Sequence, residues 1–175
     1  MRRIRADIGR MELAAIVADT LRAHDVDAVL VGGSVVAFYS NGKYVTDDLD
    51  FVSHKPLKTI APLMERLGFQ MNGNTAVHPA TKLYVQFCAP PLAIGRQPVV
   101  SVALETAHGT VETLAPTDCV LDRLMHYYHW NDEQALEQAL LVARSQKIDL
   151  RRIRDVSKSE GKLEAFEQFR ARLRK

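Results

Sequence analysis

The chain has 175 residues and a formal net charge of +2, with 47% hydrophobic and 25% charged residues. These proportions are ordinary for a folded globular protein, so they exclude a disordered chain, and the length favours one domain over two. A net charge this small does not by itself require a nucleic-acid partner.

Nothing in the sequence predicts secretion or a membrane span. Cys88 and Cys119 stand far apart, without the spacing of a zinc site, which favours a reducing compartment. Glu12 and Asp19 interrupt the apolar run that follows the arginine-rich start, so we predict no signal peptide. No apolar run has the length of a membrane-spanning helix. We therefore expect a cytoplasmic protein with no membrane partner.

Helices and strands alternate in the first part of the chain. Apolar residues recur at helical spacing near the start, and a continuous apolar run follows that is typical of a strand covered on both faces. The elements predicted in chain order are a helix at 10–24, a strand at 28–31, a short helix closed by Asn41-Gly42, a strand at 48–52 and a helix at 55–67.

Short strands and then helices are predicted for the rest. In the strand at 82–87 the side chains of Lys82, Tyr84 and Gln86 share one face, and a hairpin is expected at 99–114. Four helices should follow, the later three preceded by Asn131, Asp149 and Ser159. The fold class is therefore α/β, with a mixed sheet and flanking helices in residues 1–115. Residues 116–175 should form a helical region packed on that core as one compact unit.

Two carboxylates and a glycine-rich turn are the candidate functional residues. On a strand, positions i and i+2 point to the same side, so Asp48 and Asp50 should project together. Two adjacent carboxylates repel each other unless a cation lies between them, and oxygen ligands suit Mg²⁺. Gly32, Gly33 and Ser34 lie where a helix begins, with a spacer of thirteen residues before Asp48, and the free N–H groups of a helix start suit phosphate. The alternative is that Ser34 only caps the helix.

These residues resemble the signature of the nucleotidyltransferase superfamily typified by DNA polymerase beta. The matching segments are Val31-Gly32-Gly33-Ser34 and Asp48-Leu49-Asp50-Phe51. The resemblance covers most of residues 26–144 and is closest to small bacterial abortive-infection toxin nucleotidyltransferases and uncharacterised relatives. It implies a Mg²⁺- or Mn²⁺-dependent enzyme that transfers a nucleotidyl group from an NTP to an acceptor and releases pyrophosphate.

The resemblance also implies roles for individual residues. Asp48 and Asp50 are the metal ligands, and Gly32, Gly33 and Ser34 bind phosphates. Many members carry a third catalytic carboxylate on a neighbouring strand, and that position corresponds to Gln86, which is not a base near neutral pH. Positive charge over the triphosphate would come from Lys82 and Arg123. Glu105 or Glu112 from the hairpin is an alternative source of the third carboxylate.

Several alternatives remain open at this level. The acceptor is unidentified: a tRNA end, a protein hydroxyl or a small molecule would each suit this fold, and a cognate antitoxin is a possible partner. Because of Gln86, the chain could instead be a catalytically degenerate nucleotide-binding module. The spacing of Asp122, His126 and His129 allows a transition-metal site on one helix. Arginines crowd both ends of the chain, which allows RNA binding or a solvated helix face.

Overall fold

The computed structural model describes residues 3–95 and 97–174. Its strands are β1 (Val29–Val31), β2 (Asp48–Val52), β3 (Gln70–Asn72), β4 (Thr75–Val77), β5 (Tyr84–Cys88), β6 (Ala93–Ile94), β7 (Gln97–Pro98), β8 (Val102–Thr106) and β9 (Gly109–Thr113). Its helices are α1 (Arg10–Arg22), α2 (Gly32–Tyr39), α3 (Leu57–Arg66), α4 (Pro116–Trp130), α5 (Glu133–Ser145), α6 (Leu150–Ser159) and α7 (Leu163–Leu173). No described helix is both long and apolar enough to cross a membrane.

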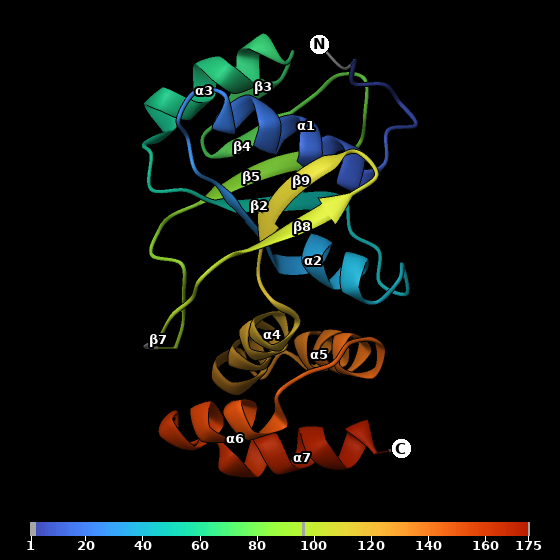
Figure 1. Cartoon of the computed structure of the whole chain (residues 1–175), viewed down its shortest axis with the longest axis vertical. Helices are drawn as coiled ribbons and strands as arrows, with labels where there is room; N and C mark the ends of the chain where they lie inside the picture. Colours follow the sequence, from blue (N-terminus) through green and yellow to red (C-terminus); the bar gives the residue numbers. More distant parts are fainter. Residues whose placement is uncertain (1–2, 96, 175) are drawn as a thin grey trace.

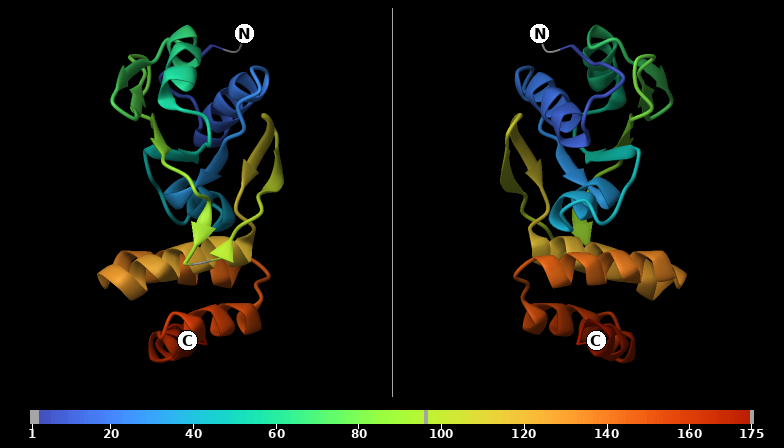
Figure 2. Two further views of the ribbon diagram at one scale, coloured as in Figure 1. Left: turned by 90° about the vertical axis from the view of Figure 1, so that its left-hand side faces the viewer. Right: turned by 90° about the vertical axis from the view of Figure 1, so that its right-hand side faces the viewer.

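A mixed sheet with the strand order β3-β4-β5-β2-β1-β9-β8 forms the centre of the molecule (Figure 1). β2 runs antiparallel to β1 and parallel to β5, and β1 is parallel to β9. Helices α1 and α3 cover one face, and α2 lies against the other face, between the sheet and the pair α4–α5 (Figures 1 and 2). Helices α6 and α7 form an outer layer beyond that pair. The predicted α/β class, with flanking helices and a helical C-terminal region, is confirmed.

The core side of β2 explains why this strand forms where it does. Leu49 and Phe51 have no solvent-exposed surface, and the rings of Phe51 and Phe87 pack with centroids 6.3 Å apart. Burying such side chains is the main favourable term in folding. The alternate positions of the strand are thereby directed to the opposite face, where polar side chains lie.

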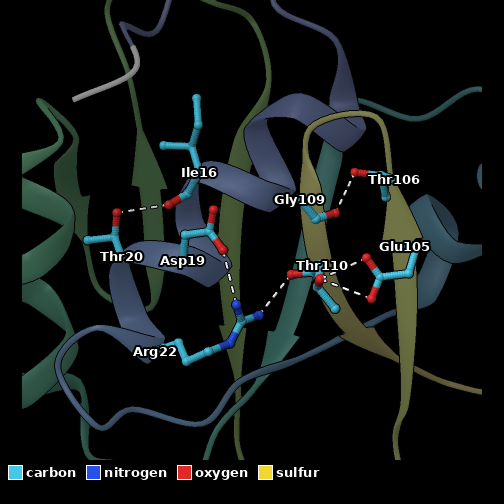
Figure 3. Close-up of polar contacts among 8 residues, drawn as sticks. All are labelled: Ile16, Asp19, Thr20, Arg22, Glu105, Thr106, Gly109 and Thr110. Atoms are coloured by element: carbon cyan, nitrogen blue, oxygen red, sulfur yellow. Dashed lines mark hydrogen bonds and ion pairs between the residues drawn. The ribbon is translucent and has the colours of Figure 1, made fainter.

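The β8–β9 hairpin is held against α1 by polar contacts (Figure 3). Arg22, at the end of α1, donates to the Thr110 carbonyl at 2.8 Å and pairs with Asp19 at 3.0 Å. Gly109 has a φ of 134°, and a Cβ at this position would lie 3.2 Å from Asp19 Oδ2. Glycine at this position therefore suits both the positive φ and the close approach of the hairpin to the helix.

Several boundaries differ from those predicted. β5 begins at Tyr84, so Lys82 precedes the strand, and the short ribbon β6–β7 was not predicted. Residues 97–98 form β7, which pairs with β6, and β8 begins at Val102 instead of at 99.

Two of the three predicted helix starts are wrong. Asp149 caps α6 by accepting from the Arg152 N–H at 3.0 Å, as predicted. Asn131 instead ends α4 in a left-handed conformation with φ 52°, and Asp132 caps α5. Ser159 is the last residue of α6, and α7 begins after Lys162. Asn131 and Asp132 are adjacent, and either residue type can end one helix or cap the next. The sequence alone does not decide which of the two takes the N-cap position of α5.

Candidate functional site

The face of β2 opposite the core presents two carboxylates. Asp48 and Asp50 are partly exposed, while Leu49 and Phe51 between and after them are buried. The predicted alternation is therefore confirmed, and the two acidic side chains belong to the same face of the strand. Thr46, two residues earlier, donates a hydrogen bond from its hydroxyl to Asp48 Oδ1.

The backbone of the first residue of α2 lies in close contact with the side chain of Asp50. Gly32 has a φ of 69°, and a Cβ built on it would lie 2.5 Å from Asp50 Oδ2. No side-chain atom can occupy that space without displacing the carboxylate. The glycine thus places the start of α2 directly beside Asp50, which joins the two halves of the motif in space.

Gly33 and Ser34 complete the first turn of α2. A Cβ on Gly33 would lie 3.2 Å from the ring of Tyr44 and 3.4 Å from Thr46 Cγ2. Ser34 is 2% exposed, and its hydroxyl donates to the Asp48 carbonyl at 2.5 Å. The residue that caps α2 is Val31, so the alternative role of Ser34 as the helix cap is wrong. The serine hydroxyl instead ties the helix to the strand that carries the carboxylates.

Burial dominates the electrostatics of Asp50. Burial first and the negative charge of Asp48 second raise the pKa of this carboxyl to about 6, although the Arg123 guanidinium acts to lower it. Asp122 also acts on Asp50 with a repulsive charge. Both α4 residues therefore act on Asp50 across the space between helix and sheet. An added cation near the pair would remove the cost of ionising it.

Gln86 lies next to Asp50 on the neighbouring strand. The parallel register of β2 and β5 pairs Asp48 with Tyr84 and Asp50 with Gln86. The position at which the resemblance leads us to expect a third carboxylate therefore carries an amide, which ligates weakly and does not accept a proton near neutral pH. Gln86 lies on the same face of the sheet as the acidic pair.

The two hairpin glutamates do not replace that carboxylate. Glu105 accepts from the Thr110 hydroxyl at 2.9 Å, and Glu112 accepts from Ser101 at 2.7 Å. Glu105 lies on β8 and Glu112 lies on β9, and β1 separates both strands from β2. Across residues 3–95 and 97–174, no group of three or more Asp, Glu, His and Cys side chains is placed to hold a metal ion.

Lys82 lies at the edge of the candidate site. Its ammonium is 3.0 Å from Asp47 Oδ1, and the lysine side chain is 75% exposed. That Asp47 oxygen is shielded from solvent and has no hydrogen bond. The ion pair with Lys82 therefore offsets the free energy lost when this charged oxygen is removed from water. Lys82 therefore neutralises Asp47, and its contact with a nucleotide stays a prediction.

Arg123 is held by its own helix and by α5. Its guanidinium donates to Asp122 Oδ2 at 2.6 and 3.0 Å and to the Gln138 amide oxygen at 3.3 Å, and its side chain is 13% exposed. A cation this well anchored provides a fixed positive charge opposite Asp50. Sequence reasoning missed Asp122 as the anchor of Arg123, although its position beside Arg123 was the available signal.

The alternative transition-metal site on α4 is wrong for the described residues. His126 packs against the Trp130 ring with centroids 5.0 Å apart, and His129 lies 3.5 Å from Glu160. The two histidines are thus engaged with other partners and do not converge with Asp122.

Two cavities border residues near the acidic pair and are not lined by Asp48 or Asp50. One of about 360 Å³ borders Ser34 and Arg10, and one of about 320 Å³ borders Lys55 and Cys88. The second cavity is also lined by Phe87 and by Leu57 and Ile60 of α3, so it lies at the end of β5 beside α3. Burial raises the pKa of the Cys88 thiol, which keeps it neutral.

Comparison with solved structures identifies the fold. The chain is similar to an antigenic nucleotidyltransferase-like protein from Paracoccidioides brasiliensis, with a TM-score of 0.56 and 15% identity, covering 78% of this chain and 76% of that one. A solution structure of the antibiotic-resistance factor ANT(2'')-Ia has a TM-score of 0.49 and 14% identity, covering 90% of this chain and 91% of that one. A crystal structure of ANT(2'')-Ia in complex with adenylyl-2''-tobramycin has a TM-score of 0.46 and 14% identity, covering 90% and 92%.

No protein-family model and no curated protein matches the chain. Identities this low show a shared fold and leave activity and substrate open. The TM-score of 0.56 and the arrangement of the mixed sheet with its flanking helices lead to one conclusion: the chain has the fold of nucleotidyltransferase-like proteins.

Proposed function

We propose that the chain is a Mg²⁺-dependent nucleotidyltransferase. The observation that carries the proposal is the contact between Gly32 and Asp50, because it places a helix start beside a pair of carboxylates. In the reaction, an acceptor hydroxyl or phosphate oxygen bonds to the α-phosphorus of an NTP. The bond from that phosphorus to the bridging oxygen breaks, and pyrophosphate leaves. The proton of an attacking hydroxyl passes to solvent.

The donor set at the pair fits a hard cation. Asp48 and Asp50 offer carboxylate oxygens, and Mg²⁺ is commonly bound by one or two carboxylates together with substrate phosphates and water. Mg²⁺ or Mn²⁺ held there would supply positive charge to the phosphates and would lower the pKa of an attacking hydroxyl. Thr46, whose hydroxyl bonds Asp48, would hold that carboxylate in position.

The other residues of the proposed site bind and orient the nucleotide. The backbone N–H groups of Gly32, Gly33 and Ser34 begin α2 and would donate to phosphate oxygens. The Ser34 hydroxyl is already used by Asp48, so it positions the strand. Arg123 would offset the charge that develops on the leaving group. In this arrangement residues 1–115 carry the acidic pair and residues 116–175 close the site through α4.

A transfer assay with the wild-type chain tests the proposal. The protein is incubated with each α-labelled NTP, with Mg²⁺ or with EDTA, and with a lysate that supplies tRNA, proteins and small molecules. We expect label to pass to one class of acceptor, with pyrophosphate released only when Mg²⁺ is present. Mg²⁺-independent labelling, or no nucleotide binding at all, would exclude the proposed activity.

The second candidate function keeps nucleotide binding and drops catalysis. Gln86 opposite Asp50 favours it, because no described carboxylate takes that position. In that case an NTP raises the unfolding temperature of the chain, and no product forms with any acceptor.

Gln86→Glu separates the two candidates. A carboxylate beside Asp50 would provide a general base, and general bases contribute about 10²-fold or more to rate. We expect the active enzyme to become at least about tenfold faster, measured as initial rate at saturating Mg²⁺. Gln70→Glu adds the same charge at an exposed position of β3 and should leave the rate unchanged. If both variants and the wild type bind NTP and release no pyrophosphate, the chain is a nucleotide-binding module without catalytic activity.

We further propose membership of the small bacterial toxin-type nucleotidyltransferases, with a cognate antitoxin as partner. The run of residues 118–140, which resembles that group in sequence, supports this subgroup. Induced expression of the chain should then arrest bacterial growth, and Asp50→Asn should relieve the arrest. Equal growth of cells that express either form would contradict it.

A further inference from the structure

Helix α6 carries a row of cations that no acidic side chain neutralises. Arg151, Arg154 and Lys158 are separated by three and four residues, so they share one face of the helix. All three are exposed. Within the part of the chain that the structure describes, none of the three takes part in an ion pair or a side-chain hydrogen bond.

The neighbouring arginines behave differently, which makes the α6 row specific. Arg152 is bonded to Asp118 of α4 at 2.5 Å. Arg170 pairs with Glu167 at 2.6 Å, and Arg172 pairs with Glu133 at 3.1 Å and also with Glu137. Arg152 and Arg172 therefore join different helices and Arg170 pairs within α7, whereas the row on α6 has no acidic partner.

Lysines extend the row beyond both ends of α6. Lys147 precedes the helix and Lys162 follows it, so residues 147–162 contain six Lys and Arg against three Asp and Glu. Of those acids, Asp149 caps α6 and Glu160 lies 3.5 Å from His129, which leaves Asp155 beside the row. The surface keeps a net positive charge along its length.

We propose that this row binds the sugar–phosphate backbone of a nucleic acid. Arg151 and Lys158 are separated by about 10 Å along the helix axis, and successive phosphates of a strand rise by about 3.4 Å, so the row spans about three phosphates. Unpaired cations that neutralise phosphates release the counterions of the nucleic acid on binding, which is the main source of such affinity.

The composition of the same helix disfavours an anionic lipid surface. Ile153 and Val156 are buried against the other helices, and the exposed apolar surface of α6 is confined to Leu150. A membrane-binding helix instead exposes an apolar stripe beside its cations. α6 lies in the outer layer, beyond α4 and α5 from the sheet, so this surface is separate from Asp48 and Asp50 and does not depend on the proposed transfer reaction (Figures 1 and 2).

Fluorescence anisotropy with the full chain tests the proposal. The probes are a labelled RNA hairpin and a DNA hairpin of the same sequence, each titrated between 50 and about 200 mM KCl. The test variant is Arg151→Gln/Arg154→Gln/Lys158→Gln. We expect it to bind at least about tenfold more weakly at low salt, with the slope of log K against log salt reduced by about 2 to 3.

The matched control removes three exposed or paired cations from other helices. Lys58→Gln/Arg66→Gln/Arg170→Gln changes the net charge by the same amount and should leave both the affinity and the salt slope close to wild type. Equal losses in the two triple variants, or no loss in the α6 variant, would overturn the proposal. So would binding of the chain to phosphatidylserine vesicles but to neither hairpin. Unchanged unfolding temperatures will show that the α6 variant is folded.

Discussion

Replacing Asp50 with asparagine is expected to slow nucleotidyl transfer about 10³-fold and, in the absence of metal, to stabilise the protein at neutral pH. The loss of rate is expected because asparagine keeps the shape of the side chain and removes the charge that would hold the proposed cation. The gain in stability follows because burial and Asp48 make ionisation of Asp50 costly. Active sites commonly contain such destabilising charges.

The stability effect has a defined pH window. The pKa of Asp50 in the fold is raised to about 6 from an ordinary value of 3.8. Its cost to stability is therefore absent below about pH 4, grows as pH rises through the interval to about 6, and is complete above it. Because the carboxylate is partly exposed, we expect about 2 kcal/mol at pH 7.5 from urea unfolding in EDTA. The difference between Asp50→Asn and wild type should vanish at pH 4.

Two comparisons make the Asp50 experiment decisive. Mg²⁺ should raise the unfolding midpoint of the wild type and leave that of Asp50→Asn unchanged. Asp47→Asn removes a neighbouring carboxylate that pairs with the exposed Lys82, so its rate should stay within about threefold of wild type. A rate that is equally low in both variants would show that the acidic segment matters only for folding.

The second large effect is expected from Gly32→Ala. An alanine at φ 69° costs about 1 kcal/mol in backbone strain, and its Cβ would lie 2.5 Å from Asp50 Oδ2. The carboxylate or the start of α2 must move, so we expect a total destabilisation of about 2 to 3 kcal/mol and a loss of transfer of about 10²-fold. Urea unfolding and the initial transfer rate measure the two effects.

Gly42→Ala separates the strain from the clash. Gly42 has a φ of 76°, close to that of Gly32, and a Cβ at this position would meet no atom within 4 Å. We expect this variant to lose about 1 kcal/mol of stability and to keep its transfer rate. If Gly32→Ala behaves in the same way, Asp50 does not need its close contact with α2.

The sequence predicts the part of the site that depends on local geometry. The alternation of β2 gives the common face of Asp48 and Asp50, and the register with β5 brings Gln86 beside them as predicted. Both results depend on backbone pairing over a few residues, which hydrophobic alternation specifies. The fold class follows from the same patterns.

Contacts between distant residues were not predictable in this way. The Ser34 hydroxyl donates to the Asp48 carbonyl, which lies fourteen positions away, and Lys82, two residues before β5, pairs with Asp47 before β2. Strands β6 and β7 have two residues each and include Pro98, so they carry no periodic signal. A side chain's partner depends on the tertiary packing that brings two segments together.

The bond between Arg152 and Asp118 has a consequence for how the two proposed surfaces work together. It ties α6 to the beginning of α4, and the same α4 carries Arg123 opposite Asp50. This ion pair therefore joins α6 to the helix that carries Arg123. A nucleic-acid strand bound to α6, as proposed, would be held in the outer layer of the molecule, with α4 between it and the sheet that carries Asp50 (Figures 1 and 2).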